Sequence, residues 1–294
     1  MLKAFRAYQV HGELNADLSG INEYVFRTCS EQELERVGFV PVMNEHVTHN
    51  VSGSNWFRIK KEKKQIPASS VADQLKTLVS VFENEHGRKP GKKEKSELKE
   101  KVVIDLASRA LPSISYIDGY FNNDVVVILT SSASAAEDAM ALLRKALGSL
   151  PVGHYLDSGK LSESLQSWFR GDSLPQNVKL GHEVKLSTMD EEKSTATIKN
   201  DALQAEEIQA LLSARRVVSL ELEIADKASF LIKDDGAFTK ISVSDVALEA
   251  HNNEQGDVEG DAAQMEANMI LKSAIVADIL GTIEAVRSSA PTKE

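Results

Sequence analysis

Residues 55–112 read NWFRIKKEKKQIPASSVADQLKTLVSVFENEHGRKPGKKEKSELKEKVVIDLASRALP, and this stretch decides the most distinctive part of the fold. After Pro67, apolar side chains recur at offsets 0, 4, 7, 8 and 11, which places them on one face of a helix. They are Val71, Leu75, Leu78, Val79 and Phe82. The first half of the stretch therefore predicts an amphipathic helix that ends at His86-Gly87 and is followed by a turn at Pro90-Gly91.

A second helix is predicted directly after that turn. Its apolar positions recur every four residues and are Leu98, Val102, Leu106 and Ala110, and the helix ends at Leu111-Pro112. On its surface Lys92, Lys95 and Lys99 fall on one face, whereas Lys101 and Arg109 fall on another. The two helices form an αα-hairpin with a short basic loop, and long cationic side chains on such a projection suit contact with a groove or a phosphate backbone.

Charge is distributed unevenly along the 294 residues. The whole chain has 34 Lys plus Arg against 44 Asp plus Glu, a net charge of −10, which taken alone argues against a nucleic-acid partner. Residues 58–109, however, hold 14 basic and 8 acidic residues, a net charge of +6, while residues 112–294 hold 16 basic and 29 acidic residues. Because exposed charges are screened beyond about 8–10 Å, the local field decides phosphate binding and the total does not exclude it.

Two basic runs make up this positive segment. One is Arg58–Lys64, at the end of a predicted strand, and the other begins at Arg88 and continues to Lys101. Each run alone is also typical of a solvated face held by Glu–Lys pairs, which is a common arrangement. Here, however, two such runs bracket one short helical segment. The sequence therefore favours a binding surface and a solvated face about equally.

Outside the hairpin, residues 1–66 and 112–159 predict a central α+β domain, and residues 160–294 a second, base domain. In the first we expect strands at 4–10, 113–118 and 124–130, and helices at 17–27 and 133–147. A Ser30–Glu33 capping box predicts a short helix that stops at Gly38. Residues 46–51 and 55–60 predict a β-hairpin around Ser52-Gly53-Ser54. The sheets are expected to be mixed or antiparallel, and the fold class α+β.

The base domain is predicted to mix short strands with helices. Helices are expected at 160–170, 203–214 and 262–287, and strands within 178–199, broken at 190–195. In the strand 216–224, Val218, Leu220, Leu222 and Ile224 are expected to share one face. Asp234-Asp235-Gly236 is a turn signal between strands 228–233 and 237–243. Residues 250–261 are expected to form an exposed acidic loop.

Several chemistries find no support in the sequence. The longest aliphatic run is Val125–Leu129, too short to cross a bilayer, and the first residues lack a secretory apolar region, so a soluble, cytosolic protein is expected. The single Cys29 excludes an internal disulfide and is expected to be a small buried side chain. His46 and His49 would point to opposite faces of a strand, which argues against a shared metal. We therefore predict no enzyme activity, no cofactor, no metal site and no small-molecule substrate.

Several spaced segments resemble one protein family. Lys60-Lys61-Glu62-Lys63-Lys64-Gln65-Ile66-Pro67 and Lys92-Lys93-Glu94-Lys95-Ser96-Glu97-Leu98-Lys99-Glu100 are similar to lysine-rich segments of the RdgC recombination-associated proteins. The most specific match is Ala141-Leu142-Leu143-Arg144-Lys145-Ala146-Leu147-Gly148-Ser149-Leu150-Pro151. Trp168, Glu206-Glu207-Ile208, Arg216-Val217-Val218 and Asp234-Asp235-Gly236 continue the resemblance in order, to about residue 243.

The resemblance implies a ring-shaped homodimer that is closed by hairpin tips at one contact and by the base regions at the other. Its basic inner surface would encircle duplex DNA without sequence preference. Such proteins are nucleoid-associated in the cytoplasm, act in replication and recombination, and restrain RecA by occupying DNA; they are not enzymes and need no membrane. Leu111 stands where the family often has Phe, and is the expected dimer-contact residue. Asn200 and Asp201 depart from a family Lys-Gln step, and Ser108 replaces a family Pro.

The basic runs and the resemblance together predict a set of DNA-binding residues. They are Arg58, Lys60, Lys61, Lys63, Lys64, Arg88, Lys89, Lys92, Lys93, Lys95, Lys99, Arg109, Lys199 and Arg216. One alternative is a protein–protein module of the recombination or replication machinery in which the hairpin docks on an acidic partner and DNA binding is incidental. A DNA-processing enzyme is a further alternative, which the lack of a clustered carboxylate or histidine site disfavours.

Overall fold

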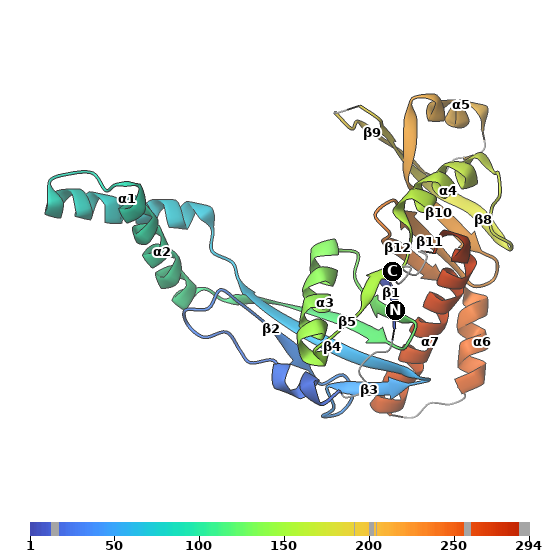
Figure 1. Ribbon diagram of the computed structural model, residues 1–294, viewed down its shortest axis with the longest axis horizontal. Coiled ribbons are helices and arrows are strands. Elements are labelled where there is room, and N and C mark those ends of the chain that lie inside the picture. The colour runs from blue at the N-terminus through green and yellow to red at the C-terminus, as the bar shows by residue number, and fades with distance from the viewer. Residues whose placement is uncertain (13–17, 191, 200–202, 204, 256–259, 288–294) are drawn as a thin grey trace.

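The computed structural model describes residues 1–12, 18–190, 192–199, 203, 205–255 and 260–287, and its centre is one antiparallel sheet (Figure 1). Within the described residues the twelve-stranded sheet runs in the order β2-β4-β5-β6-β1-β12-β11-β10-β8-β9, with β3 beside β4 and β7 beside β1. The strands are β1 Ala4–Val10, β2 Glu35–Val40, β3 Thr48–Val51, β4 Ser54–Lys64, β5 Pro112–Phe121, β6 Val125–Ile128, β7 Val152–His154, β8 Val178–Thr188, β9 Thr195–Lys199, β10 Arg215–Ile224, β11 Ala228–Lys233 and β12 Phe238–Val243. The predicted α+β class with antiparallel pairing is confirmed.

The helices are α1 Ala68–His86, α2 Lys92–Arg109, α3 Ala133–Leu147, α4 Ser158–Arg170, α5 Glu206–Gln209, α6 Asp245–Gln255 and α7 Asp261–Thr282, with 3-10 turns at Ser19–Tyr24, Ala210–Ser213 and Glu284–Val286. We call β2–β6 the blade, and β8–β12 with α4, α6 and α7 the C-terminal lobe. The hairpin of α1 and α2 extends from the far end of the blade, so hairpin and lobe lie at opposite ends of an elongated molecule (Figure 1).

The hairpin forms as the sequence predicts. Pro67 is the N-cap of α1, and Gly87, with φ of 64°, ends it in the left-handed conformation that glycine tolerates. The Glu94 carboxylate accepts the Gly91 N–H at 2.8 Å and so caps the start of α2. Of its described residues, α1 buries none fully, whereas α2 buries Val102 and Ala107. The two helices pack mainly on each other and leave much of their apolar stripe open.

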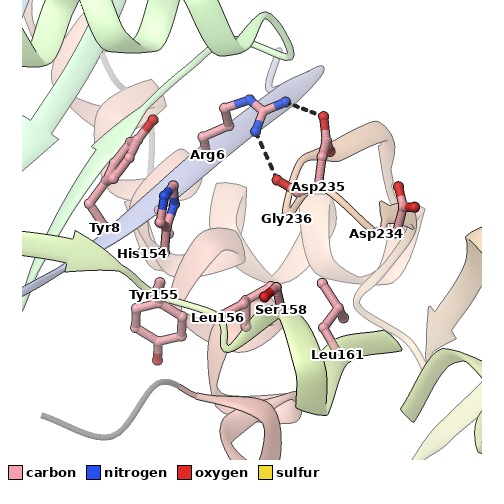
Figure 2. Close-up of a pocket in the computed structure, with 11 residues that line it drawn as sticks. Arg6, Tyr8, His154, Tyr155, Leu156, Ser158, Leu161, Asp234, Asp235 and Gly236 are labelled. Carbon is pink, nitrogen blue, oxygen red and sulfur yellow. Dashed lines mark hydrogen bonds and ion pairs between the residues drawn. The ribbon is translucent and has the colours of Figure 1, made fainter. Parts of the chain in front are cut away.

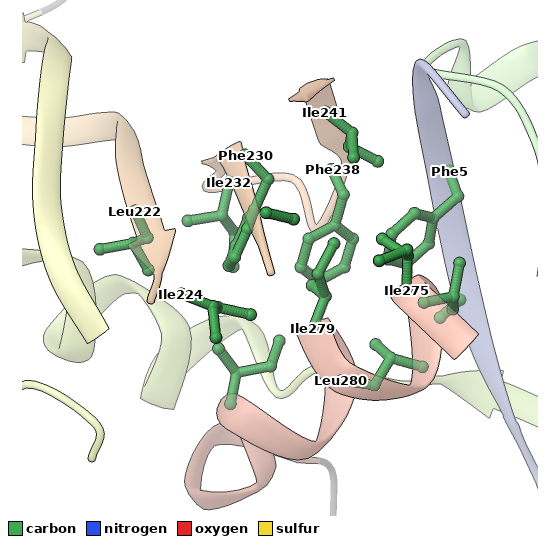
Figure 3. Close-up of a cluster of buried hydrophobic side chains, with 14 of the residues drawn as sticks. Phe5, Leu222, Ile224, Phe230, Ile232, Phe238, Ile241, Ile275, Ile279 and Leu280 are labelled. Carbon is green, nitrogen blue, oxygen red and sulfur yellow. The ribbon is translucent and has the colours of Figure 1, made fainter. Parts of the chain in front are cut away.

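Two apolar cores hold the sheet. One lies between α3 and the blade and contains Phe57, Ile59 and Leu143. The other lies between the sheet and the helices of the lobe, where Ile275 and Ile279 of α7 pack beneath the strands (Figure 3). At about 25 cal/mol per Å² of buried apolar surface, such cores supply the dominant stabilising term. Trp168 and Phe169 of α4 are buried in this second core.

One predicted helix is a strand. The Ser30 N–H does bond the Glu33 carboxylate at 2.8 Å, but this capping contact closes a turn and no helix follows. Residues 35–40 instead pair with β4 over six registered positions. Gly38 lies against the segment before the turn, where a Cβ would come within 2.5 Å of Phe26 Cα. The long-range ladder therefore overrides the local helix signal, and Gly38 serves close packing.

Other predicted boundaries shift for local reasons. The helix expected at 17–27 is one 3-10 segment at 19–24, and residues 13–17 lie outside the described residues. The helix expected at 203–214 is only α5 and a 3-10 turn. The prediction of an exposed acidic loop at 250–261 is wrong at its start, because α6 continues to residue 255. Residues 256–259 are not among the described residues.

Two further expectations about single side chains are wrong. Val218 does not share the buried face of β10, because a bulge between Val217 and Ser219 shifts the register and buries Val217 instead. Cys29 is partly exposed rather than buried, and its backbone N–H bonds Glu62 at 3.1 Å. Its partial removal from water and the neighbouring Glu62 carboxylate raise the pKa of its thiol.

Candidate nucleic-acid interface

The predicted cations of β4 project alternately from the two faces of the blade. Lys61 and Lys63 lie on the side of α3, as the Lys61–Asp138 contact to that helix indicates. Arg58, Lys60 and Lys64 project from the opposite side. The run that is contiguous in sequence is thus divided between two surfaces and does not form one basic patch.

Most of the β4 cations are also paired within the fold. Arg58 donates two hydrogen bonds to Asp118 on β5, at 2.5 and 3.0 Å, and this bonding raises the pKa of the guanidinium. Lys61 lies 2.7 Å from Glu35 and 2.9 Å from Asp138. Burial lowers the pKa of Lys61, but these two carboxylates outweigh it and the net shift is upward. These charges are largely neutralised before any ligand approaches.

The other side of β4 is similar. The Lys60 ammonium lies 2.8 Å from Glu62 and 4.3 Å from the centre of the Phe26 ring. Lys64 is buried, and its ammonium donates to the carbonyls of Ser30 and Glu31 at 2.6 and 2.9 Å. Lys63, on the α3 side, is the most open of the run, with 61% of its side chain exposed and Glu35 at 3.7 Å.

The hairpin presents the freer cations. Five lysines around its loop are exposed, and their side-chain ammonium groups form no salt bridge or hydrogen bond with any described residue: Lys89, Lys92, Lys93, Lys95 and Lys99. Arg88 differs, because its guanidinium donates hydrogen bonds to both Glu94 carboxylate oxygens, at 2.8 and 2.7 Å. The hydrogen bonds from Arg88 and from the Gly91 N–H lower the pKa of Glu94 to about 2. The Arg88–Glu94 pair fixes the loop, and the five lysines project around it.

The remaining predicted cations lie elsewhere. Arg109 is exposed and pairs with Asp105 one turn away at 3.0 Å. Lys199, at the outer edge of the sheet, lies 3.8 Å from Glu183, and Arg216 lies 3.3 Å from Asp234. A single chain does not bring Lys199 and Arg216 near the hairpin, since these are opposite ends of the molecule (Figure 1). Asn200 and Asp201 are outside the described residues.

Sequence reasoning passed over two cations on α3. Arg144 and Lys145 occupy its last turn, are exposed, and form no ion pair with the residues the structure describes. Lys145 also lines an open groove of about 590 Å³ with Arg27 and Arg36. Cations in a last helical turn also suit the helix dipole, which is why the pattern gave no distinct binding signal. Their adjacency on the polar side of an amphipathic helix was the available cue.

An apolar strip lies at the base of the hairpin. We define it as Leu111, Ile114 and Tyr116, which are 89, 53 and 59% exposed. Ile114 and Tyr116 share one face of β5 and are registered opposite Glu62 and Lys60. Leu111, the predicted dimer-contact residue, is therefore exposed in the single chain, where a second protein chain could contact it.

Other chemistry is limited in the described part of the chain. It contains no group of three or more His, Cys, Asp and Glu side chains that could hold a metal. It likewise contains no helix long and apolar enough to span a membrane. Asp234 and Asp235 occupy the β11–β12 turn and pair with two different arginines, Arg216 and Arg6. The turn explains both carboxylates without a catalytic role.

Comparison with known proteins decides the family. The sequence model of the family described as "Putative exonuclease, RdgC" matches residues 2–286. The chain belongs to the RdgC family. A protein named Recombination-associated protein RdgC from Pseudoalteromonas atlantica is 34% identical over 257 residues, covering 86% of this chain and 84% of that protein. Proteins of the same name from Colwellia psychrerythraea and Yersinia enterocolitica are each 31% identical, over 259 and 279 residues.

The RdgC resemblance predicted from sequence is therefore confirmed over nearly the whole chain. The Colwellia protein covers 86% of this chain, and the Yersinia protein 92%. The family description and the relatives' names differ in emphasis, since the first mentions an exonuclease and the second recombination. Both agree on the RdgC family itself.

Proposed function

We propose that the protein binds double-stranded DNA without sequence preference, and that it does so as a homodimeric ring with a basic inner surface. By occupying DNA on the nucleoid it would limit the access of RecA and so modulate recombination and replication. No cofactor, small-molecule substrate or membrane enters this function. Membership of the RdgC family supports the recombination setting, and the charge arrangement of the hairpin supports the DNA contact.

The observation that carries the proposal is the group of five unpaired lysines at the hairpin loop. An ammonium that has no internal carboxylate partner can neutralise a phosphate and release the counterion condensed there. Residues 88–101 hold seven basic and three acidic residues, a net charge of +4. Lysine contacts to phosphates carry no direct base information, so binding to unrelated sequences should be similar.

The elongated shape is compatible with a ring. Hairpin and lobe are the two ends of the chain's long axis (Figure 1), so two copies that touch at both ends would enclose a hole. A ring would also bring Lys199 and Arg216 of the lobe to the same hole as the hairpin lysines. Residues 241–271 contain seven acidic and no basic residues, and on an outer surface they would repel DNA.

Binding to several unrelated duplexes over a salt series tests the proposal. Each neutralised phosphate contributes a slope of roughly −0.9 in log K against log salt. We expect a steep negative slope that is the same for every duplex. A slope near zero, or strong binding to only one sequence, would contradict non-specific backbone contact.

The protein–protein module remains the second candidate because the hairpin exposes apolar as well as basic side chains. Val81 and Ile104 are 44 and 41% exposed, and α1 buries none of its described residues fully. Measurement of the solution mass, followed by retention on closed circular compared with linear duplex, separates the two functions. A ring gives a dimer that is retained on the circle and slides off free ends, whereas a monomer that binds DNA weakly favours the module.

The exonuclease named in the family description is tested directly by incubation of DNA with the protein and magnesium. We predict no cleavage, because no described cluster of carboxylates and histidines is arranged for metal-assisted hydrolysis. Any shortening of a labelled duplex that depends on magnesium and on the protein would overturn this prediction.

A further inference from the structure

The blade and the C-terminal lobe meet in the sheet at one strand, β1. On one side β1 pairs with β6 of the blade at four positions, from Arg6 to Gln9. On the other side it pairs with β12 of the lobe at only two positions, Ala4 and Phe5, and with β7 from Tyr8 onward. In the described chain Arg6 therefore has no registered strand partner on that side, and Ala7 is held there only through its carbonyl, which accepts the Tyr155 N–H at 3.3 Å. The sheet is split at this point.

A cleft occupies the split. It has a volume of about 300 Å³, and its walls come from both parts of the molecule. Arg6, Tyr8 and His154 line one side, and the turn Asp234–Gly236 lines the other (Figure 2). Leu156, Ser158 and Leu161, around the start of α4, close the cleft at another side (Figure 2). Between β1 and the lobe the ladder is short, with two registered pairs and the Ile241 N–H to Lys3 carbonyl bond at 3.2 Å, so a change of angle here would strain few backbone hydrogen bonds.

We call the boundary between the blade and the C-terminal lobe at β1 the seam. Different contacts stabilise its two faces. On the α7 face Phe5 stacks on Phe238, with ring centres 4.4 Å apart, and the core runs on without interruption from the lobe to Trp56 of the blade. Arg6 projects from the opposite face, because neighbouring residues of a strand alternate. An apolar core that is continuous on only one face is suited to act as an axis, about which the other face can open.

Arg6 spans the face that can open. Its guanidinium donates to the Ser131 carbonyl at 3.1 and 3.2 Å, at the turn between β6 and α3. It also donates to the Asp235 carbonyl at 3.0 Å and to the Asp235 carboxylate at 2.6 Å, across the cleft in the lobe. Only 10% of the Arg6 side chain is exposed. One planar guanidinium thus donates hydrogen bonds to both the blade side and the lobe, and the bond to the Asp235 carboxylate is charge-assisted.

We propose that β1 is a hinge between the blade and the C-terminal lobe, and that the Arg6–Asp235 contact is the latch that sets the angle between them. The inference concerns a single chain and does not depend on DNA binding. The hairpin is a long lever on this hinge, because the eleven residues of β4 span roughly 36 Å and the nineteen of α1 roughly 28 Å. A rotation of a few degrees at the seam would move the hairpin tip by several ångström.

The turn that contains Asp235 also contains a residue, Asp234, that is suited to a matched control variant. Asp234 pairs with Arg216 at 3.3 Å, and both of these residues belong to the lobe. Asp235→Asn and Asp234→Asn remove the same charge from adjacent positions, but only the first weakens a contact that crosses the cleft. Asn at 235 keeps an oxygen to accept the Ala237 N–H, as Asp235 does at 3.1 Å, and presents an amide N–H₂ to Arg6.

Distance measurement between spin labels tests the latch. In a Cys29→Ser background, labels at Glu85→Cys on α1 and Glu223→Cys on β10 report the hairpin–lobe distance, since both positions are exposed. Labelled protein is mixed with a large excess of unlabelled protein, so that an assembly carries one labelled chain. We expect Asp235→Asn and Arg6→Met to shift or broaden the distance distribution by several ångström, and Asp234→Asn to leave it unchanged.

Two outcomes would overturn the proposal. One is a distribution in both latch variants that equals that of the parent protein. The other is a change in Asp234→Asn as large as that in Asp235→Asn, since the effect would then come from the turn and not from the seam. Asp235 has about half of its side chain exposed, so its variant is expected to fold even if Arg6→Met does not. Circular dichroism of each labelled variant verifies the sheet before the distances are compared.

Discussion

At the residue scale, a cation contributes to DNA binding only if its charge is not already used inside the fold. Lys64 and Lys63 are neighbours in one basic run, yet Lys64 is buried against two backbone carbonyls and Lys63 is largely exposed. Sequence predicts the positive run but not this difference, because the carbonyl partners at 30 and 31 are more than thirty residues away. We therefore leave Lys64 out of the proposed contact surface.

The first prediction compares these two lysines. Lys64→Ala should lower the free energy of unfolding by about 1–3 kcal/mol, because it removes a buried side chain together with its two charge-assisted hydrogen bonds to backbone carbonyls. Lys63→Ala should change it by less than about 0.5 kcal/mol. Urea unfolding of both variants measures the difference. If Lys64→Ala is as stable as Lys63→Ala, the buried contact has no structural weight.

A second prediction concerns Glu94, whose pKa is lowered to about 2 by Arg88 and the Gly91 N–H. A carboxyl with a depressed pKa in the folded protein adds stability above its unfolded pKa of about 4.5, and this contribution is lost as pH falls toward 2. Glu94→Gln should therefore melt below the parent protein at pH 6, and the gap should close toward pH 2. A gap that is independent of pH would show that the charge of Glu94 does not stabilise the loop.

At the element scale, local signals predict those elements whose partners are close in sequence. The hairpin α1–α2, the helix α3 and the β11–β12 turn follow from periodicity and turn chemistry within a few residues. The strand β2 does not, because its local Ser30–Glu33 signal is a real capping contact while its pairing is with β4, about 25 residues away. The same holds for the paired state of the β4 cations, which depends on carboxylates of β2, β5 and α3.

A third prediction tests why Gly38 lies in β2. Gly38→Ala should destabilise the protein by about 1–3 kcal/mol, because the added Cβ would meet backbone atoms of Phe26 that cannot move freely. The matched control is Gly281→Ala in the last turn of α7, where a Cβ meets nothing within 4 Å. That change should be neutral or stabilising by up to about 1 kcal/mol. Thermal unfolding of both variants gives the comparison, and equal effects would contradict close packing at Gly38.

At the scale of the whole molecule, net charge is a poor guide to function. The chain totals −10, yet the five exposed lysines with unpaired ammonium groups gather at the hairpin loop, and the hairpin is the end of the molecule that is farthest from the C-terminal lobe (Figure 1). Charge segregation along the sequence was predictable by counting. The shape was not, since it depends on β1 joining the blade and the lobe in one sheet. For the same reason the seam and its Arg6 latch had no sequence signal.

The salt dependence of duplex binding by a hairpin variant tests the central proposal most directly. Lys89→Ala, Lys92→Ala and Lys93→Ala remove three exposed, unpaired cations together, and the control replaces three exposed lysines of other regions, Lys3, Lys179 and Lys193. At roughly 0.9 per phosphate, we expect the hairpin variant to reduce the slope of log K against log salt by about two to three, on every duplex alike, and the control to reduce it less. An unchanged slope in the hairpin variant would contradict DNA binding through the hairpin.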